Sequence, residues 1–154
     1  MASFKLNRHF DVVYCLHNSV NHLQTFEKWE AMFRNVAQHL NKNGLFVFDI
    51  NPVDKMENMA TLSPSIKQVG NSYIITQFFR DPSRARSYIW DVKILKKKKN
   101  GYAVRHEPIE VSSYPNDQIL AALHRDFEVV DSFVPIAPTI SDDVGRMYYV
   151  CIKK

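Results

Sequence analysis

The stretch FDVVYCLHNSVNHL, residues 10–23, decides the fold, because an apolar run passes there directly into a polar loop. Residues 10–16 have the length of a strand, and their nearly continuous hydrophobicity is typical of a strand covered on both faces. A second run of this kind, LFVFDI, occupies residues 45–50. The two runs predict neighbouring parallel strands.

The segment between the two runs predicts a helix. In TFEKWEAMFRNVAQHLNKNG, residues 25–44, apolar residues recur three or four positions apart, as they do on one face of a helix. Thr25 is a suitable N-cap and Gly44 a suitable stop. Strand, helix and strand then form one right-handed βαβ unit. The apolar positions are Phe26, Trp29, Phe33, Val36, Ala37 and Leu40.

The second half of the chain predicts consecutive antiparallel strands. Segments 72–81, 86–95 and 101–114 are rich in β-branched and aromatic residues and are separated by turn signals, so they predict a meander. A short helix with Ile119, Leu120 and Leu123 inward is expected after Pro115. Two closing strands are predicted over residues 127–134 and 146–153, with a loop over 132–145 between them.

Composition limits the class of protein. The 154 residues suit one domain, and no apolar run approaches the roughly 18 residues needed to cross a membrane. The opening MASFKLNRHF lacks an apolar signal segment, which predicts a soluble cytoplasmic protein. The net charge of +4 is mostly local, because four lysines (residues 96–99) precede the hairpin signal Asn100-Gly101. We interpret them as a solvated tip rather than a nucleic-acid patch, since no aromatic residues are interleaved with them.

The cysteines and histidines give no metal pattern. Cys15 and Cys151 lie in apolar runs and are expected to be reduced core residues. His17 and His22 are five positions apart, which fits no common zinc motif. The sequence therefore predicts no metal site.

Polar residues follow both predicted parallel strands. Ligands bind at the carboxyl ends of parallel strands, so these residues are expected to line one rim. An alternative stays open, in which the Asn and Ser side chains only cap the next helix. The rim residues are His17, Asn18, Ser19, Asn21, His22, Asp49 and Asn51.

His106 stands apart, in the meander. It shares a strand face with Glu110 rather than with Glu107, and either acid-base work or a cross-strand surface pair would explain it.

Residues 10–52 resemble the fourth strand, helix and fifth strand of class I S-adenosylmethionine-dependent methyltransferases. The meander, the segment SSYPNDQILAALHRDFEVV (residues 112–130) and the ending GRMYYVCIKK are similar in order to the subgroup that includes sugar amine N-methyltransferases. The resemblance implies an α/β fold, the C-terminal part of a Rossmann-like methyltransferase. Residues 1–52 and 115–154 would form a partial core within one domain, and residues 66–113 an antiparallel cap over the substrate pocket.

The family's glycine-rich cofactor loop has no counterpart in this chain. Its four glycines lie far apart, NKNG replaces the usual Pro-Gly-Gly, and RDF stands where Gly-Phe is common. By the family's layout, Met1 falls just after the third strand. The resemblance therefore implies a C-terminal portion that needs an N-terminal segment, a complementing chain or a second copy before it binds S-adenosylmethionine.

Site residues follow from the same resemblance. Leu16, His17 and Asn18 would lie against the cofactor, and His22 would be a general base or only a positioning residue, because alignment alone accelerates methyl transfer. The resemblance also places Cys15 and Cys151 two strand spacings apart, roughly 9–10 Å, too far for a disulfide. The substrate would contact Asn21, Asn51, Tyr88, Trp90, Tyr102 and His106.

The expected activity is S-adenosylmethionine-dependent methylation of a small molecule. The alternative is a non-catalytic methyltransferase-like module that acts by dimerisation or by pairing with another chain.

Overall fold

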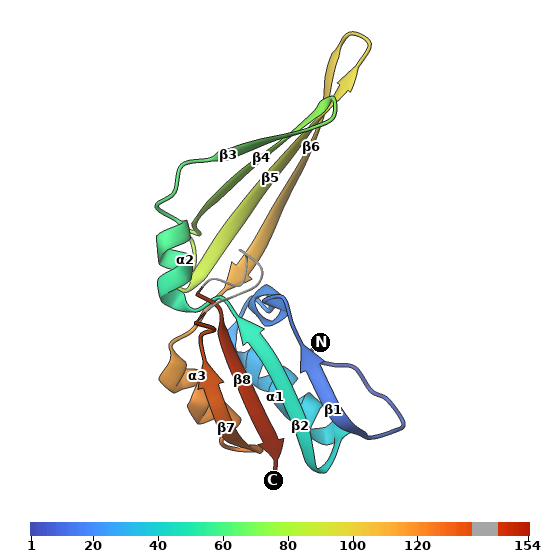
Figure 1. Cartoon of the computed structure of the whole chain (residues 1–154), viewed down its shortest axis with the longest axis vertical. Coiled ribbons are helices and arrows are strands. Elements are labelled where there is room, and N and C mark those ends of the chain that lie inside the picture. The colour runs from blue at the N-terminus through green and yellow to red at the C-terminus, as the bar shows by residue number, and fades with distance from the viewer. Residues whose placement is uncertain (137–144) are drawn as a thin grey trace.

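The computed structural model describes residues 1–136 and 145–154, and within them the chain forms two four-stranded sheets (Figure 1). We call them the core sheet and the meander sheet. The strands of the core sheet, in spatial order, are β1 (Phe10–Cys15), β2 (Leu40–Ile50), β8 (Met147–Lys153) and β7 (Phe127–Phe133). The strands of the meander sheet are β3 (Ser65–Val69), β4 (Ser72–Arg80), β5 (Ser87–Lys98) and β6 (Gly101–Ser112).

The core sheet confirms the predicted βαβ unit. Strands β1 and β2 are parallel, and helix α1 (Phe26–His39) connects them. Strand β8 pairs antiparallel with β2, and β7 pairs antiparallel with β8. Helix α3 (Asn116–Leu123) begins directly after Pro115, as predicted, with Ile119 and Leu123 buried and Leu120 only partly buried.

Helices α1 and α3 pack on one face of the core sheet and form the hydrophobic core with it (Figure 1). Trp29 and Phe33 from α1 and Leu123 from α3 are buried there with side chains of the strands. Burial of one such aromatic side chain contributes on the order of 2 kcal/mol to folding.

The other face of the core sheet is not covered by a helix in the described part of the chain. Val12 is 53% exposed and Tyr14 is 72% exposed, so the expectation that residues 10–16 form a strand covered on both faces is wrong. The reason is that β1 is an edge strand with a helix layer on one side only. We call the apolar residues that share this side by strand register the open face: Val12, Tyr14, Leu45, Val47, Val150 and Ile152.

The two ends of α1 differ in how well they were predicted. Thr25 is the N-cap, and its hydroxyl accepts a hydrogen bond from the backbone N–H of Lys28 at 3.4 Å. The predicted stop at Gly44 is wrong, because the helix ends at His39 and the chain enters β2 at once. Asn43, within β2, has a left-handed backbone conformation, with φ 62.

Gly44 is required for space rather than for conformation. A Cβ atom there would lie 2.9 Å from the carbonyl oxygen of Asn41 and 3.2 Å from that of Asp11. The carbonyl of Asp11 cannot move aside without displacing β1, and that of Asn41 cannot move without displacing the start of β2, so glycine lets β1 approach β2 closely.

We expect Gly44→Ala to lower the free energy of unfolding by about 2–3 kcal/mol, measured by urea denaturation, because overpacking forces the backbone to shift. Gly70→Ala is the control. Gly70 has a positive φ of 57 but nothing lies within 4 Å of an added Cβ, so only the left-handed conformation costs energy, about 1 kcal/mol. Equal losses in the two variants would contradict the close approach of β1 and β2.

The meander is confirmed, with additions. Strands β4, β5 and β6 lie where the sequence predicts them, but β3 and helix α2 (Val53–Met59) were not predicted. Lys98 pairs with Gly101, so the hairpin loop is Lys99-Asn100, one residue earlier than expected. The meander sheet extends away from the core sheet, and the lysines at its tip are exposed (Figure 1).

The remaining predictions concern the termini of the fold and the cysteines. Strands β7 and β8 are confirmed, whereas part of the expected loop 132–145 lies outside the described residues. Both thiols are free, and their strands are separated by β2, as the resemblance implied. Burial raises the pKa of the Cys151 thiol to about 12. Cys15 is only partly buried, and burial and the charge of Asp49 raise its pKa.

No helix in the described ranges is both long and apolar enough to cross a membrane. Residues 1–136 and 145–154 also contain no group of three or more His, Cys, Asp or Glu placed to hold a metal ion.

Candidate functional site

A cavity of about 500 Å³ lies between the carboxyl ends of the parallel strands and the meander sheet. We call it the strand-end cavity. The core sheet and its loops contribute Asn18, Asn51 and Arg146 to its wall, and the meander sheet contributes Phe78, Trp90 and Val111. The remaining lining residues, from α2 and the segment after it, are Lys55, Met56, Met59 and Leu62.

The loop after β1 is held in an unusual conformation at the edge of this cavity. His17 and Asn18 are consecutive non-glycine residues with positive φ, 59 and 50. Such conformations cost energy and persist only where neighbouring groups hold them. The backbone N–H of Asn18 donates to Asp49 Oδ2 at 3.0 Å, and the hydroxyl of Ser19 donates to the carbonyl of Leu16 at 2.6 Å.

Asp49 is the buried charge that organises this end of the sheet. Its side chain is fully buried, and Oδ2 also accepts a hydrogen bond from Arg146 Nη1 at 3.2 Å. Oδ1 of Asp49 is buried without a hydrogen-bond partner among the described residues. A carboxylate placed here fixes the loop after β1 and the start of β8 together.

Asn51 lines the cavity and carries a hydrogen-bond acceptor that is not satisfied. The residue is 9% exposed, and its buried Oδ1 atom has no hydrogen-bond partner within the described part of the chain. A buried acceptor without a partner costs about 1–3 kcal/mol, so it favours a ligand that carries a donor. Asn18 and Asn51 are the two predicted rim residues that line the strand-end cavity.

The structure does not bring the other predicted rim residues, or the predicted cofactor contact Leu16, to the cavity wall. Leu16 and His17 are exposed. His22 is exposed at the end of a short 3-10 helix, η1 (Ser19–His22), and lines neither the strand-end cavity nor the second cavity described below. Asn21 is fully buried behind the wall, where its amide binds backbone groups. Their proposed roles stay predictions.

The four meander residues divide between opposite faces of the sheet. Tyr88 and Trp90 share one face of β5, and Asp91, which follows Trp90, lies on the other face. The register places Tyr102 and His106 on the face of Asp91, opposite to Trp90. Trp90 is 40% exposed and lines the strand-end cavity. Tyr88 is buried, and its hydroxyl donates to Glu57 Oε1 at 2.7 Å; burial and Glu57 raise its pKa.

The two residues on the far face have partners of their own. His106 and Glu110 share a face of β6, as predicted, but they do not pair: His106 contacts Asp91, and Glu110 binds Arg84 at 2.8 Å. The contact between His106 on β6 and Asp91 on β5 is a cross-strand pair, which was one of the two explanations offered for His106. Tyr102 lies with its ring centroid 6.0 Å from that of Tyr73.

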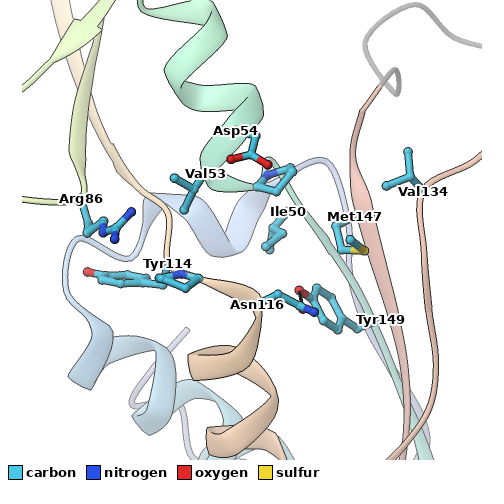
Figure 2. Close-up of a pocket in the computed structure, with 11 residues that line it drawn as sticks. Ile50, Val53, Asp54, Arg86, Tyr114, Asn116, Val134, Met147 and Tyr149 are labelled. Atoms are coloured by element: carbon cyan, nitrogen blue, oxygen red, sulfur yellow. Dashed lines mark hydrogen bonds between the residues drawn. The ribbon is translucent and has the colours of Figure 1, made fainter.

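A second cavity, of about 440 Å³, lies beside the ends of β2 and β8 (Figure 2). None of the predicted site residues lines it. Arg86 and Asp54 lie at its rim, and the hydroxyl of Tyr149 donates to Asn116 Oδ1 at 2.7 Å on its opposite side. These polar groups come from separate elements, so no spacing in the sequence indicates them.

Comparisons with protein-family models and with curated proteins found no match. Solved structures of methyltransferases do match, and each of the three described here aligns with 99% of this chain. An S-adenosylmethionine-dependent methyltransferase from Clostridium acetobutylicum has a TM-score of 0.81 at 18% identity. CalS10, an amino pentose methyltransferase from Micromonospora echinaspora solved with S-adenosylmethionine bound, has a TM-score of 0.75 at 16% identity.

The sugar N-methyltransferase KedS8 from Streptoalloteichus has a TM-score of 0.73 at 17% identity. The chain covers 61%, 62% and 60% of these three proteins, respectively. It therefore has the fold of the C-terminal part of Rossmann-like S-adenosylmethionine-dependent methyltransferases, with an antiparallel meander inserted in it.

Proposed function

We propose that this chain takes part in S-adenosylmethionine-dependent methylation of a small molecule, which it binds in the strand-end cavity. One observation carries the proposal: a cavity with a buried, unpartnered acceptor opens at the carboxyl ends of parallel strands in a methyltransferase fold. Such ends are where α/β sheets bind ligands. A cytoplasmic location is part of the same proposal.

The residues of the cavity suit a methyl acceptor with an amine or hydroxyl group. Asn51 Oδ1 would accept a hydrogen bond from that group and orient its lone pair. Phe78 and Trp90 would supply apolar walls that exclude water. Because methyl transfer depends mainly on alignment, these contacts contribute even if no base acts. His22 stays a candidate for the proton acceptor.

The cofactor would lie against Leu16, His17 and Asn18. Asp49 holds this loop in a left-handed conformation beside the cavity. Backbone held in such a conformation is common at ligand sites, which supports a ligand here. S-adenosylmethionine supplies the methyl group when bound. The chain contains no glycine-rich loop to add backbone donors, so we propose that tight binding requires a second polypeptide segment.

The unpaired edge of β1 and the open face would receive that segment. Strand β1 ends the core sheet, and its residues Val12 and Tyr14 are exposed. An apolar edge strand favours pairing with another strand. A complementing chain that adds strands to this edge would extend the core sheet, and a further element of that chain would be needed to cover the open face.

Titration with S-adenosylhomocysteine, followed by the backbone amide resonances of the labelled chain, tests the cofactor site. We expect shifts at Leu16, His17 and Asn18 that saturate only at high ligand concentration. The amide of Tyr102, on the far face of the meander, is the internal control. A folded spectrum without changes at residues 16–18 would overturn the proposal, and His22→Ala shows whether the histidine contributes.

A second candidate function is a non-catalytic module that acts by dimerisation or by pairing with another chain. The open face favours it, because an apolar sheet surface of this kind is typical of an interface. Light scattering at increasing concentration should then show twice the monomer mass, and Tyr14→Glu should abolish the dimer. Tyr102→Glu, at a tyrosine that is 47% exposed in the meander, is the control.

A further inference from the structure

The side chain of Asn21 joins the core sheet to the meander sheet. Its Oδ1 atom accepts a hydrogen bond from the backbone N–H of Asn51 at 2.9 Å. Its Nδ2 atom donates to the carbonyl of Asn51 at 3.0 Å and to the carbonyl of Ser112 at 2.8 Å. Both amide hydrogens are therefore used, and the side chain is fully buried.

Further buried bonds surround this contact. Ser113 Oγ donates to the carbonyl of Asn51 at 2.9 Å, and Ser112 Oγ donates to the carbonyl of Leu23 at 2.6 Å. Trp29 Nε1 donates to Leu23 O at 2.9 Å and to Ser112 Oγ at 3.2 Å. A buried polar network in which the members satisfy one another fixes a single arrangement of its elements. We call this network the junction: Asn21, Leu23, Trp29, Asn51, Ser112 and Ser113.

The junction lies directly behind two walls of the strand-end cavity. Asn51, whose backbone N–H and carbonyl both bind the Asn21 side chain, lies in one wall. Ser112 ends β6, and the preceding residue, Val111, lies in the other wall with Trp90. The three bonds of Asn21 therefore hold one wall in register with the other.

We propose that Asn21 is a positioning residue for the strand-end cavity and not a group that contacts the substrate. It acts through the backbone of Asn51 and through the end of β6. This inference rests on the proposed function in one respect, because that function assigns ligand binding to the strand-end cavity. Its test uses no ligand. A failure of S-adenosylhomocysteine to bind would therefore leave it untouched.

Asn21→Asp is the sharpest variant, because it keeps the shape and the acceptor for Asn51 N–H but loses both donations. The chain has two tryptophans, and their indole resonances report separately on the junction (Trp29) and on the cavity (Trp90). We expect the Trp90 indole resonance to move and amide exchange at Ser112, Ser113 and Val111 to rise by about tenfold or more. Exchange at Phe46 and Cys151, in the core sheet, should change far less.

Asn35→Asp is the matched control, since Asn35 is also a buried asparagine but donates to Met1 O at 3.3 Å, away from the cavity. It should leave Trp90 unchanged. A uniform rise in exchange across both sheets, or an unmoved Trp90 resonance in Asn21→Asp, would overturn the proposal. If Asn21→Asp does not fold, Ser113→Ala removes one bond of the same junction and should give the same local pattern at smaller amplitude, and its absence would equally overturn the proposal.

Discussion

Asp49→Ala is expected to lower the free energy of unfolding by about 3–5 kcal/mol, the loss typical of breaking a buried ion pair from one side. Asp49 is fully buried, and the side chain of its partner Arg146 is 7% exposed. The variant removes the carboxylate that binds both the buried Arg146 side chain and the partly buried N–H of Asn18, so both groups lose this contact. Urea denaturation followed by circular dichroism measures the loss.

The control for Asp49 is Glu110→Ala, at a surface pair. Arg84 and Glu110 lie 2.8 Å apart, closer than Asp49 and Arg146, but their side chains are 37% and 46% exposed. Exposed pairs contribute about 0–1 kcal/mol, so this variant should lose little. Similar losses in the two variants would show that burial does not decide the strength of the Asp49 contact.

Phe48→Ala is expected to cost about 3–5 kcal/mol, because it empties the centre of the core. The Phe48 side chain is fully buried, and its ring stacks on Tyr149 at 4.7 Å and on Phe46 at 4.9 Å between centroids. Removing it leaves a cavity that the stacked rings cannot fill without moving β2 or β8. The same denaturation experiment measures it.

Phe133→Ala is the comparison variant for Phe48. Phe133 also stacks on a tyrosine, Tyr148 at 5.7 Å, but it is 42% exposed. We expect a loss of about 1 kcal/mol or less, because water already reaches much of the ring. A loss as large as that of Phe48→Ala would contradict the assignment of the core to the helix-covered face.

The elements that the sequence predicts well are those whose own pattern decides them. Helix α1 buries Trp29 and Phe33 at the predicted spacing, and β4 to β6 follow their β-branched and aromatic runs. Helix α2 was not predicted, because it has only seven residues and buries only Met56, so it leaves no periodic apolar pattern. Contacts such as the hydrogen bond between Tyr88 and Glu57 stabilise it. Strand β3 is exposed throughout and exists through its pairing with β4.

The structure places two of the predicted rim residues at the wall of the strand-end cavity, and their binding roles stay predictions. Asn18 and Asn51 follow parallel strands, and the rule that ligands bind at strand ends placed them at the cavity. Arg146 was not singled out, because the partner that defines it, Asp49, lies far away along the chain. Tyr102 and His106 were grouped with Trp90 because composition carries no cross-strand register. Sequence also could not show that Asn21 is buried.

The position of β8 has a consequence for how the protein is made. This strand follows β7 along the chain, yet it lies between β2 and β7, and Leu45 pairs with Ile152. The core sheet therefore cannot close on a ribosome until β8 has left the exit tunnel. Until then the edges of β2 and β7 that later pair with β8 are unpaired. Such edges make a nascent chain prone to aggregate and favour the binding of chaperones.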